Sequence, residues 1–347
     1  MKKKDKMKRL GILLLALTAI TVIITFVIVM NLSDPTDQKG QQQEQFDDSY
    51  SGWIRNVYIM SNKDNEIIIL YDKTNYIAKG TAQNDYTGVA DIELSHGKIT
   101  RILAKPDGIE GILDRYSETE VQIKDYEALS YDDTLPVYVV ADSANVRQPV
   151  HQIAMSDLVI GNSKVKLIVA DEKACAVVQY SKDIANNIRV LLKNGNNITY
   201  SDLYIKSNKT YTVNEKKVKA KKLTKVSSYL KGKKNGEEIC ISPATGKLFI
   251  CNRKGKKLAE AYEGNFIVRK ETGGYVLINE LSVEDYVRYV LPSEMPLGFS
   301  YEALKAQAVC ARTFAYGQMH NQAYAQYGAN LDNTTAYQVI MQQQLTM

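Results

Sequence analysis

Hydrophobic residues in the first half of the chain come in short runs that alternate with turn-forming residues. Between residues 53 and 180, runs of four to seven residues are separated by segments that contain Gly, Asn, Asp or Pro. Such runs predict short strands, and a series of them favours a small barrel or sandwich. The predicted strands are 66–71, 88–94, 137–140, 164–169 and 176–180. No catalytic constellation is visible among them, so we expect a spacer or a protein-binding module.

A second strand-rich region begins near residue 186. Its predicted strands are 187–192, 198–200, 203–205, 248–250, 266–268 and 275–278. Residues 206–234, which lie between these strands, are rich in lysine. Two interpretations of the lysines remain open. They attract an anionic polymer such as the cell wall, or they protect a solvated edge hairpin against pairing with other chains.

After residue 281 the hydrophobic period becomes helical. Ser282 is placed to cap a first helix, and Ser300 a second one with Glu302 in its first turn. Because the residue before a proline avoids the α region, Pro292 predicts that the first helix ends at Leu291. The apolar stripe of this helix consists of Val283, Tyr286, Val287 and Val290.

An acidic residue stands between the two predicted helices. Glu294 lies between Pro292 and Pro296, on a short segment that both prolines stiffen. A carboxylate fixed in this way, close to the start of a helix, is the first place to expect chemistry.

The N-terminus has the pattern of an uncleaved signal anchor. Residues 1–9 are basic, and residues 10–31 supply roughly 20 apolar or small residues without a charge, enough for a helix that crosses a bilayer. The end of this run offers no small-x-small cleavage site. Since positive flanks stay in the cytoplasm, we expect the bulk of the chain outside the cell membrane. Residues 32–52 are polar and predict a solvated linker.

Charge and cysteine content narrow the function only slightly. A net charge of +5 does not demand a nucleic-acid partner. Four cysteines without Cys/His ligand spacing make a zinc site unexpected. Cys240 and Cys251 flank a turn at 242–246, so they are expected to face each other across a hairpin, as a disulfide or as paired apolar positions. Cys310, among alanines, is expected in the core. The three histidines, His96, His151 and His320, are expected at the surface.

Together the patterns predict an α+β chain. It consists of an N-terminal transmembrane helix, a mainly β first domain, and a strand-rich domain that carries a helix–loop–helix segment. The expected parts are the cytoplasmic tail 1–9, the anchor 10–31, the linker 32–52, the first β domain 53–182 and the second domain 186–347.

Several segments of the second domain follow the order of the motifs of a known family. They are YEG at 262–264, GGYVLINEL at 273–281, VEDY at 283–286, VLPSEMP at 290–296, EALKAQAV at 302–309 and ART at 311–313. In these segments the chain resembles the stage II sporulation protein D family. The resemblance covers under half of the chain, from about residue 188 to the C-terminus.

This resemblance implies a protein that acts on peptidoglycan. The family's sporulation members are lytic transglycosylases that cut glycan strands during engulfment, and other members are enhancers of a separate cell-wall amidase. In the transglycosylases the acid of the P-S-E-M-P motif is catalytic, which is Glu294 here. The resemblance further implies that Lys305 and Arg312 contribute to the site, and we count Ser293 and Tyr316 with them as substrate-binding. Glycan strands are the expected partner, with an amidase or other engulfment proteins as further partners.

The residues taken alone agree with this chemistry. A lytic transglycosylase needs only one carboxylate, because the 6-hydroxyl of the sugar is the nucleophile and the same Glu is acid and then base. We expect Glu294 to be buried near Met295 and Leu297, which would favour its protonated form. Lys305, Arg312 and Tyr316 lie at i, i+7 and i+11 and share one helix face. The alternative is a basic surface face, with Arg312 tied to a structural acid such as Glu284.

The chain departs from the family pattern in two respects. Residues 331–340 lack the cysteines that some members link to zinc, so we expect no metal and no cofactor. The family domain also continues beyond the point that corresponds to residue 347. The chain is therefore expected to be a truncated copy or a fragment, which leaves the activity of this chain open.

Overall fold

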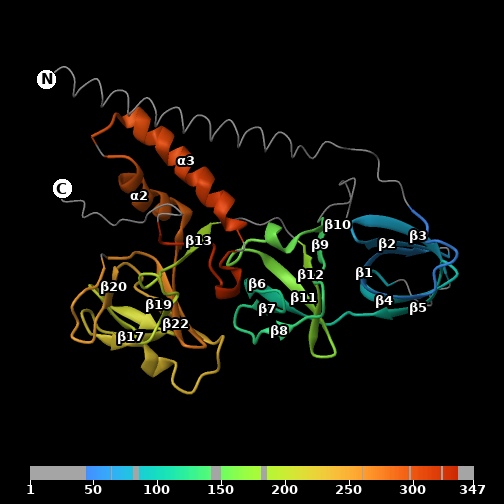
Figure 1. Ribbon diagram of the computed structural model, residues 1–347, viewed down its shortest axis with the longest axis horizontal. Coiled ribbons are helices and arrows are strands. Elements are labelled where there is room, and N and C mark those ends of the chain that lie inside the picture. The colour runs from blue at the N-terminus through green and yellow to red at the C-terminus, as the bar shows by residue number, and fades with distance from the viewer. Residues whose placement is uncertain are drawn as a thin grey trace. The chain divides into compact units, whose positions relative to one another are not determined.

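The computed structural model (Figure 1) describes residues 44–63, 65–80, 86–141, 150–180, 186–259, 261–296, 298–321 and 323–334. The chain divides into two compact units, Met1–Glu44 and Gln45–Met347. Nearly all of the first unit, with the predicted membrane anchor 10–31, lies outside the described residues. Among the residues that are described, no helix is long and apolar enough to span a membrane.

The first sheet is antiparallel, with five strands in the order β3-β2-β1-β4-β5. Its central strand β1 is twelve residues long and has a bulge between Ile54 and Val57. Alternate residues of β1 and β2, such as Val57, Ile59, Ile67 and Ile69, are fully buried in its core, as the period of two requires. The strands are β1 Gly52–Lys63, β2 Glu66–Tyr71, β3 Thr74–Lys79, β4 Gly88–Ser95 and β5 Lys98–Ala104.

The second sheet has seven strands in the order β10-β9-β12-β11-β6-β7-β8, of which only β9 and β12 pair in parallel. It shares a hydrophobic cluster with the first sheet, in which Tyr58 and Leu70 meet Tyr138 and Val178. The strands are β6 Gly108–Tyr116, β7 Glu120–Ile123, β8 Leu129–Ser130, β9 Val137–Val140, β10 Val150–Ile153, β11 Lys164–Ala170 and β12 Lys173–Gln179, and a 3₁₀ turn, η1 Met155–Asp157, follows β10.

The remaining strands form an eight-stranded sheet and a three-stranded one. The first has the path β17-β16-β19-β21-β22-β13-β23, with β14 paired to β22, and the second has the order β18-β15-β20. The bounds are β13 Asn187–Leu191, β14 Thr199–Tyr200, β15 Tyr204–Ser207, β16 Tyr211–Val213, β17 Lys216–Val218, β18 Thr224–Lys225, β19 Glu238–Ser242, β20 Leu248–Cys251, β21 Asn265–Glu271, β22 Gly274–Ser282 and β23 Leu331–Asp332, with 3₁₀ turns η2 Val226–Tyr229 and η3 Ala325–Tyr327. The described part of the chain is thus mostly β, with two helices, in agreement with the expected α+β class.

The two helices, α2 Val283–Glu294 and α3 Tyr301–Met319, have the predicted caps. The Ser282 hydroxyl accepts a hydrogen bond from the Asp285 amide, and the Ser300 hydroxyl accepts one from Ala303. The predicted stripe of α2 is buried in the largest hydrophobic cluster, against strands of the eight-stranded sheet. Its members are Val283, Tyr286, Val287 and Val290.

The predicted end of the first helix at Leu291 is wrong. Helix α2 continues through Pro292 to Glu294, and the Met295 amide still donates to the Leu291 carbonyl at 2.9 Å. A proline in the last turn removes one intrahelical hydrogen bond, from its own nitrogen to Arg288, and leaves the others in place. The restriction on the residue before proline is a preference that the buried stripe of α2 overrides.

Two cysteine predictions are also wrong. Strands β19 and β20, which carry Cys240 and Cys251, do not pair with each other: β19 pairs with β16 and β21, and β20 pairs with β15. The turn at 242–246 therefore connects two sheets, and both thiols are free. Cys310 is exposed, because α3 packs through Ala311, Ala315 and Met319 instead. The three histidines, His96, His151 and His320, are exposed as expected.

A buried charged network joins the second sheet to the eight-stranded sheet. Asp114 of β6 accepts a hydrogen bond from Arg189 of β13 at 2.7 Å and pairs with Arg269 of β21. Arg189 also pairs with Glu280 at 2.8 Å, and Arg269 with Glu238 at 2.6 Å. Both arginines are at most 1% exposed. Burial opposes the ionised form of Asp114, but the charges of Arg269 and Arg189 outweigh it and lower the pKa of Asp114.

We expect Asp114→Asn to destabilise the fold by about 3–5 kcal/mol, because it leaves two buried guanidinium groups without their shared anion. Urea unfolding followed by circular dichroism measures this change. The matched control is Asp107→Asn, an exposed aspartate at the β5–β6 turn, which should change stability by less than about 0.5 kcal/mol. Equal effects of the two substitutions would contradict the role given to the network.

Candidate functional site

Helices α2 and α3 form an antiparallel pair joined by a loop at residues 295–300 (Figure 1). The Arg312 guanidinium, in the fourth turn of α3, reaches Glu284 in the first turn of α2. This contact fixes the direction of the pair: the first turns of α3 lie beside the last turns of α2. Ser293, Glu294 and Lys305 therefore lie at the loop end of the pair, whereas Arg312 lies at its other end.

Glu294 is the last residue of α2. It follows Val287 by seven residues and Val290 by four, so its side chain continues the buried stripe one turn beyond the point where the core ends. The side chain is exposed, and the structure records no hydrogen bond or ion pair between it and a described residue. The expected burial of Glu294 is not observed; Met295 is half-buried, and Leu297 lies outside the described residues.

Tyr286, two turns before Glu294, is a buried tyrosine of the same helix. Its ring is fully buried, and its hydroxyl has no hydrogen-bond partner among the described residues. Burial, and to a smaller extent the charge of Glu294, raise the pKa of Tyr286. The hydroxyl therefore stays protonated, and it interacts electrostatically with the Glu294 carboxylate. From the sequence, Tyr286 was expected only as a member of the apolar stripe, because helical spacing does not show which tyrosine lies within reach of a charge.

Arg312 makes the ion pair that the alternative interpretation foresaw. Its Nε and Nη2 atoms donate to the two carboxylate oxygens of Glu284, each at 2.7 Å. This hydrogen bonding lowers the pKa of Glu284. Glu284 and Glu294 are ten residues apart on one helix, which corresponds to roughly 15 Å along its axis. In this structure Arg312 thus faces the acid at the opposite end of α2 from Glu294.

Lys305 lies in the second turn of α3. Its Nζ atom is 2.9 Å from a carboxylate oxygen of Glu302 and 4.9 Å from the centre of the Tyr301 ring. The lysine side chain is half exposed, so neither contact removes it from solvent. Ser293 is half-buried beside Glu294, and Tyr316 is exposed one turn beyond Arg312. The structure brings Ser293, Glu294 and Lys305 to one end of the helix pair and leaves Tyr316 near the other.

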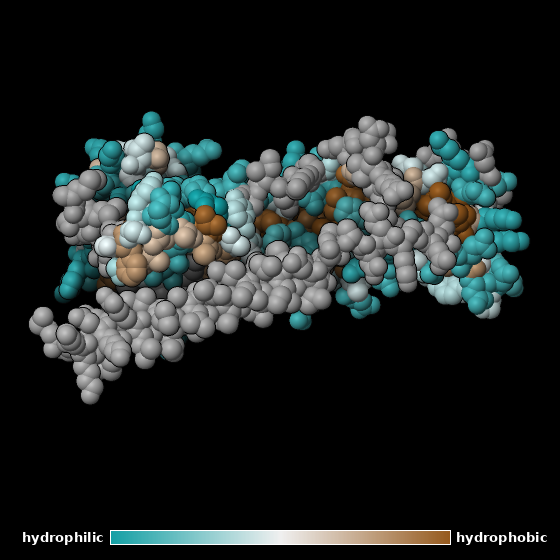
Figure 2. Space-filling model, turned by 90° about the horizontal axis from the view of Figure 1, so that it is seen from above, coloured by the Kyte–Doolittle hydropathy of each residue, from teal (hydrophilic) through white to brown (hydrophobic). Residues whose placement is uncertain are grey.

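Apolar side chains cover much of the solvent face of α3 and the loop before it. Figure 2, seen from the side on which α3 lies in Figure 1, shows tan and brown residues among teal ones there. Exposed aromatic rings offer flat apolar faces with a polar edge, which suits the ring of a sugar. Of these exposed residues, Phe299 and Tyr301 are nearest in sequence to Glu294, and neither belongs to the motifs quoted above. The exposed residues are Phe299, Tyr301, Val309, Phe314 and Tyr316.

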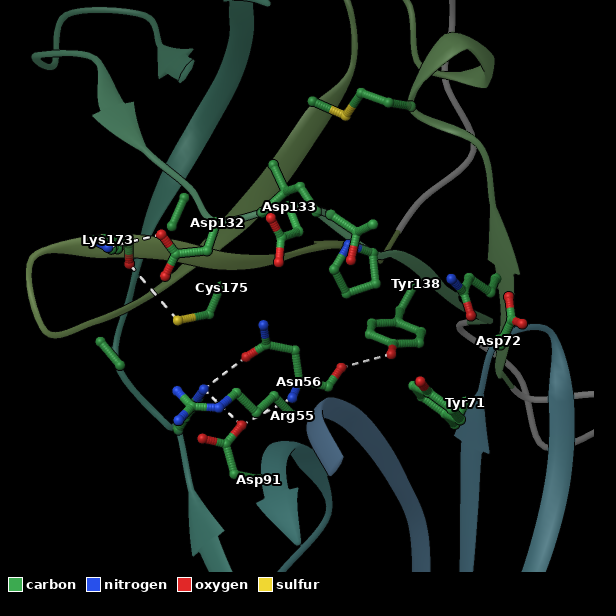
Figure 3. A pocket seen from close by; sticks show the side chains of 18 of the residues that line it. Arg55, Asn56, Tyr71, Asp72, Asp91, Asp132, Asp133, Tyr138, Lys173 and Cys175 are labelled. Carbon is green, nitrogen blue, oxygen red and sulfur yellow. Dashed lines mark hydrogen bonds and ion pairs between the residues drawn. The ribbon is translucent and has the colours of Figure 1, made fainter. Parts of the chain in front are cut away.

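The structure also shows a cavity that the sequence did not indicate. It encloses about 860 Å³ and is lined by residues of the first two sheets (Figure 3). On its floor Lys105 binds Asp91 at 2.7 Å and the Asn56 side chain at 2.6 Å, and the Tyr138 hydroxyl donates to the Asn56 carbonyl. Asp133 points into the open space. The cavity is polar and can take a small hydrophilic molecule, but its charged floor is internally neutralised.

Among the described residues, no group of three or more His, Cys, Asp or Glu side chains is arranged so that it could hold a metal ion. At the loop end, the Glu294 carboxylate suits proton transfer, and the Ser293 hydroxyl and the Lys305 ammonium group suit the binding of a polar polymer.

Comparisons with known proteins concern the same region. Residues 271–346 match the model of the family SpoIID, Stage II sporulation protein. An uncharacterized protein of Brachyspira hyodysenteriae is 44% identical over 79 residues, which are 22% of this chain and 21% of that protein. Stage II sporulation protein D of Bacillus subtilis is 42% identical over 64 residues, 18% of this chain and 19% of that protein. The protein of the same name from Bacillus amyloliquefaciens is 41% identical over 64 residues. The chain thus spans about a fifth of the length of the relatives it matches, and no solved structure matches it.

We expect the Arg312–Glu284 pair to contribute little to stability, because the two side chains are 35% and 67% exposed. A double-mutant cycle of Arg312→Gln and Glu284→Gln, measured by urea unfolding, should give a coupling energy of about 0–1 kcal/mol. A coupling energy well above this range would make the pair a structural element and weaken the case for Arg312 in substrate binding.

Proposed function

We propose that residues 271–346, which match the SpoIID model of stage II sporulation proteins, make this chain a member of that family that acts on peptidoglycan in sporulation. More specifically, it is a lytic transglycosylase anchored in the cell membrane by residues 10–31, with Glu294 as its single acid and base. The observation that supports this best is the position of Glu294, an exposed carboxylate at the end of α2 that forms no hydrogen bond or ion pair with a described residue.

The reaction needs one proton donor. Glu294, protonated, gives its proton to the glycosidic oxygen while the bond from that oxygen to C1 of the muramyl sugar breaks. The 6-hydroxyl of the same sugar then attacks C1 and returns its proton to the Glu294 carboxylate. The products are a strand with a 1,6-anhydro end and a strand with a free hydroxyl, and no water is consumed.

The residues around Glu294 have separate roles in this proposal. Lys305 lies at the same end of the helix pair and can bind acyl or lactyl oxygens of the glycan with its half-exposed ammonium group. Tyr301 and Phe299 offer exposed rings to the sugar. The Tyr286 hydroxyl is protonated, because burial and the charge of Glu294 both raise its pKa. Arg312 takes part only if it leaves Glu284 when the substrate binds.

Burial of the acid would come from the substrate itself. A glycan strand laid over Glu294 excludes water from a carboxylate that the free chain exposes, and this favours the protonated form. Glu294 therefore need not be buried in the chain without substrate.

A Glu294→Gln variant should cut denuded glycan about 10²- to 10⁴-fold more slowly, since the amide cannot transfer the proton. The measurement is the formation of 1,6-anhydro-muramyl ends, followed by mass spectrometry. Glu118→Gln, which changes an exposed glutamate of the second sheet, is the matched control and should retain full activity. A Glu294→Gln protein that cuts as fast as the unchanged chain would sink the catalytic role of this acid.

The second candidate is a non-catalytic wall-binding protein that stimulates an amidase. It is favoured by the observation that Arg312 pairs with Glu284 and not with Glu294, so Arg312 and the acid are not assembled in one cluster. In this case the chain binds glycan without producing new ends. Stimulation of a cell-wall amidase would survive Glu294→Gln, which separates the two functions.

A further inference from the structure

The lysine-rich part of the chain carries a strong local charge. Residues 206–257 contain 16 lysines and arginines against three glutamates, a net charge of +13, whereas the whole chain has a net charge of +5. The rest of the chain is therefore net negative. Protein charge segregated in this way creates a local potential that attracts anions.

Most of these cations have no carboxylate partner. Lys225, Lys233, Lys234 and Lys247 make ion pairs, with Asp202, Glu237, Glu127 and Glu263. The other exposed cations form no ion pair with a described residue. They are Lys209, Lys216, Lys217, Lys219, Lys221, Lys222, Lys231, Arg253, Lys254 and Lys256; Lys257 instead lies over the ring of Phe249, 3.7 Å from its centre.

Protection of strand edges accounts for only three of the lysines. β17 is an edge strand of the eight-stranded sheet, with Lys216 and Lys217 exposed, and β18 is an edge strand of the three-stranded sheet, with Lys225 exposed. The lysines from 219 to 222 and the cations from 253 to 256 lie in turns, outside any strand edge. Of the two interpretations that the sequence left open, edge protection is therefore insufficient.

Three cationic turns are fastened to one short stretch, residues 206–208. The Lys221 amide donates to the Ser207 carbonyl at 2.7 Å, and the Lys247 amide to the Asn208 side chain at 2.7 Å. The Lys206 ammonium group donates to the Gly255 carbonyl at 2.7 Å. The turns at 219–222, 243–247 and 252–257 are thus held around a common centre, so their charges form one surface. We call it the lysine surface; it belongs to the yellow and light-orange part of the ribbon in Figure 1.

A groove lies within the lysine surface, beside β16 and β17. Its volume is about 610 Å³, and Lys209 and Lys217 are among its lining residues. Thr210, Thr212 and Thr245 also line it. Ammonium groups beside hydroxyl groups suit phosphate and its ester oxygens, with which both form hydrogen bonds.

We propose that the lysine surface binds a linear polyanion with repeated phosphodiester groups. A groove flanked by cations fits a flexible chain better than a flat membrane. Interfacial binding to lipid also needs apolar anchors, and Leu258, just beyond the segment, is the exposed large hydrophobic residue nearest to it. The lysine surface is separate from the proposed site of glycan cleavage, because it includes neither Glu294 nor the α2–α3 pair.

The test compares two variants of the full chain that lose the same charge, in a non-ionic detergent because residues 10–31 are apolar. The first carries Lys209→Gln, Lys219→Gln, Lys222→Gln and Lys256→Gln. The second carries Lys79→Gln, Lys98→Gln, Lys124→Gln and Lys164→Gln, at exposed sites of the first two sheets. Affinity for poly(glycerol phosphate) is measured by fluorescence anisotropy over a series of salt concentrations.

The unchanged chain should bind the polymer with an affinity that falls linearly with salt on logarithmic axes. The first variant should bind at least about tenfold more weakly at low salt, with a salt slope smaller by about 3. The second variant should bind like the unchanged chain. Equal losses in both variants, or no binding by the unchanged chain, would overturn the proposal. Lysine-dependent binding to mixed micelles of the detergent with phosphatidylglycerol, without polymer binding, would also overturn it, in favour of a membrane surface.

Discussion

The buried anion of Asp114 is the constraint on which the arrangement of the described sheets depends. Two arginines that are almost without solvent, Arg189 and Arg269, meet on this one carboxylate. Burying a guanidinium group costs several kcal/mol unless its charge is met by an anion. The anion comes from β6 and the cations from β13 and β21, so the network ties the eight-stranded sheet to the second sheet.

The same network helps to position the helix pair. Arg189 stands on β13 and its partner Glu280 on β22, and these two strands lie beneath α2. Arg269 also donates to the Tyr327 carbonyl in η3, at 2.6 Å. The following Gly328 has a φ of 73°, and a Cβ there would come within 2.7 Å of the Arg269 guanidinium. The segment after α3 is therefore fastened to the residues that hold the sheet on which α2 rests.

Much of the local structure could be predicted from the sequence, because it depends on neighbouring residues. β2 has the predicted bounds, both helix caps are confirmed, and so is the stripe from Val283 to Val290. Pairings over long distances could not be predicted: the turn at 242–246 resembles a hairpin, yet its flanking strands join different sheets. The sequence did contain an indication of the buried network, because Arg189 interrupts the apolar run Ile188–Leu191. A charged residue in a buried strand is almost always paired with an opposite charge.

In the candidate site, too, local features could be predicted from the sequence and contacts between elements could not. The motif located Glu294, and helical spacing predicted a shared face for Lys305 and Arg312. Spacing along one helix left open whether Arg312 binds substrate or meets Glu284 across the helix pair, and it could not reveal that α2 continues through Pro292. Burial of Glu294 was expected from its apolar neighbours, but its side chain is exposed at the point where the core ends.

The segregation of charge in this chain gives it an electrical polarity as well as a binding surface. Residues 206–257 are strongly positive, and the remaining residues hold 36 acidic side chains against 28 basic ones. A polyanion that attracts the first group repels the second, so an encounter exerts a torque as well as a pull. Since the Debye length is about 8 Å at physiological salt, this torque acts only near contact. An anionic matrix would thus select the orientation in which the chain meets it, before any specific contact forms.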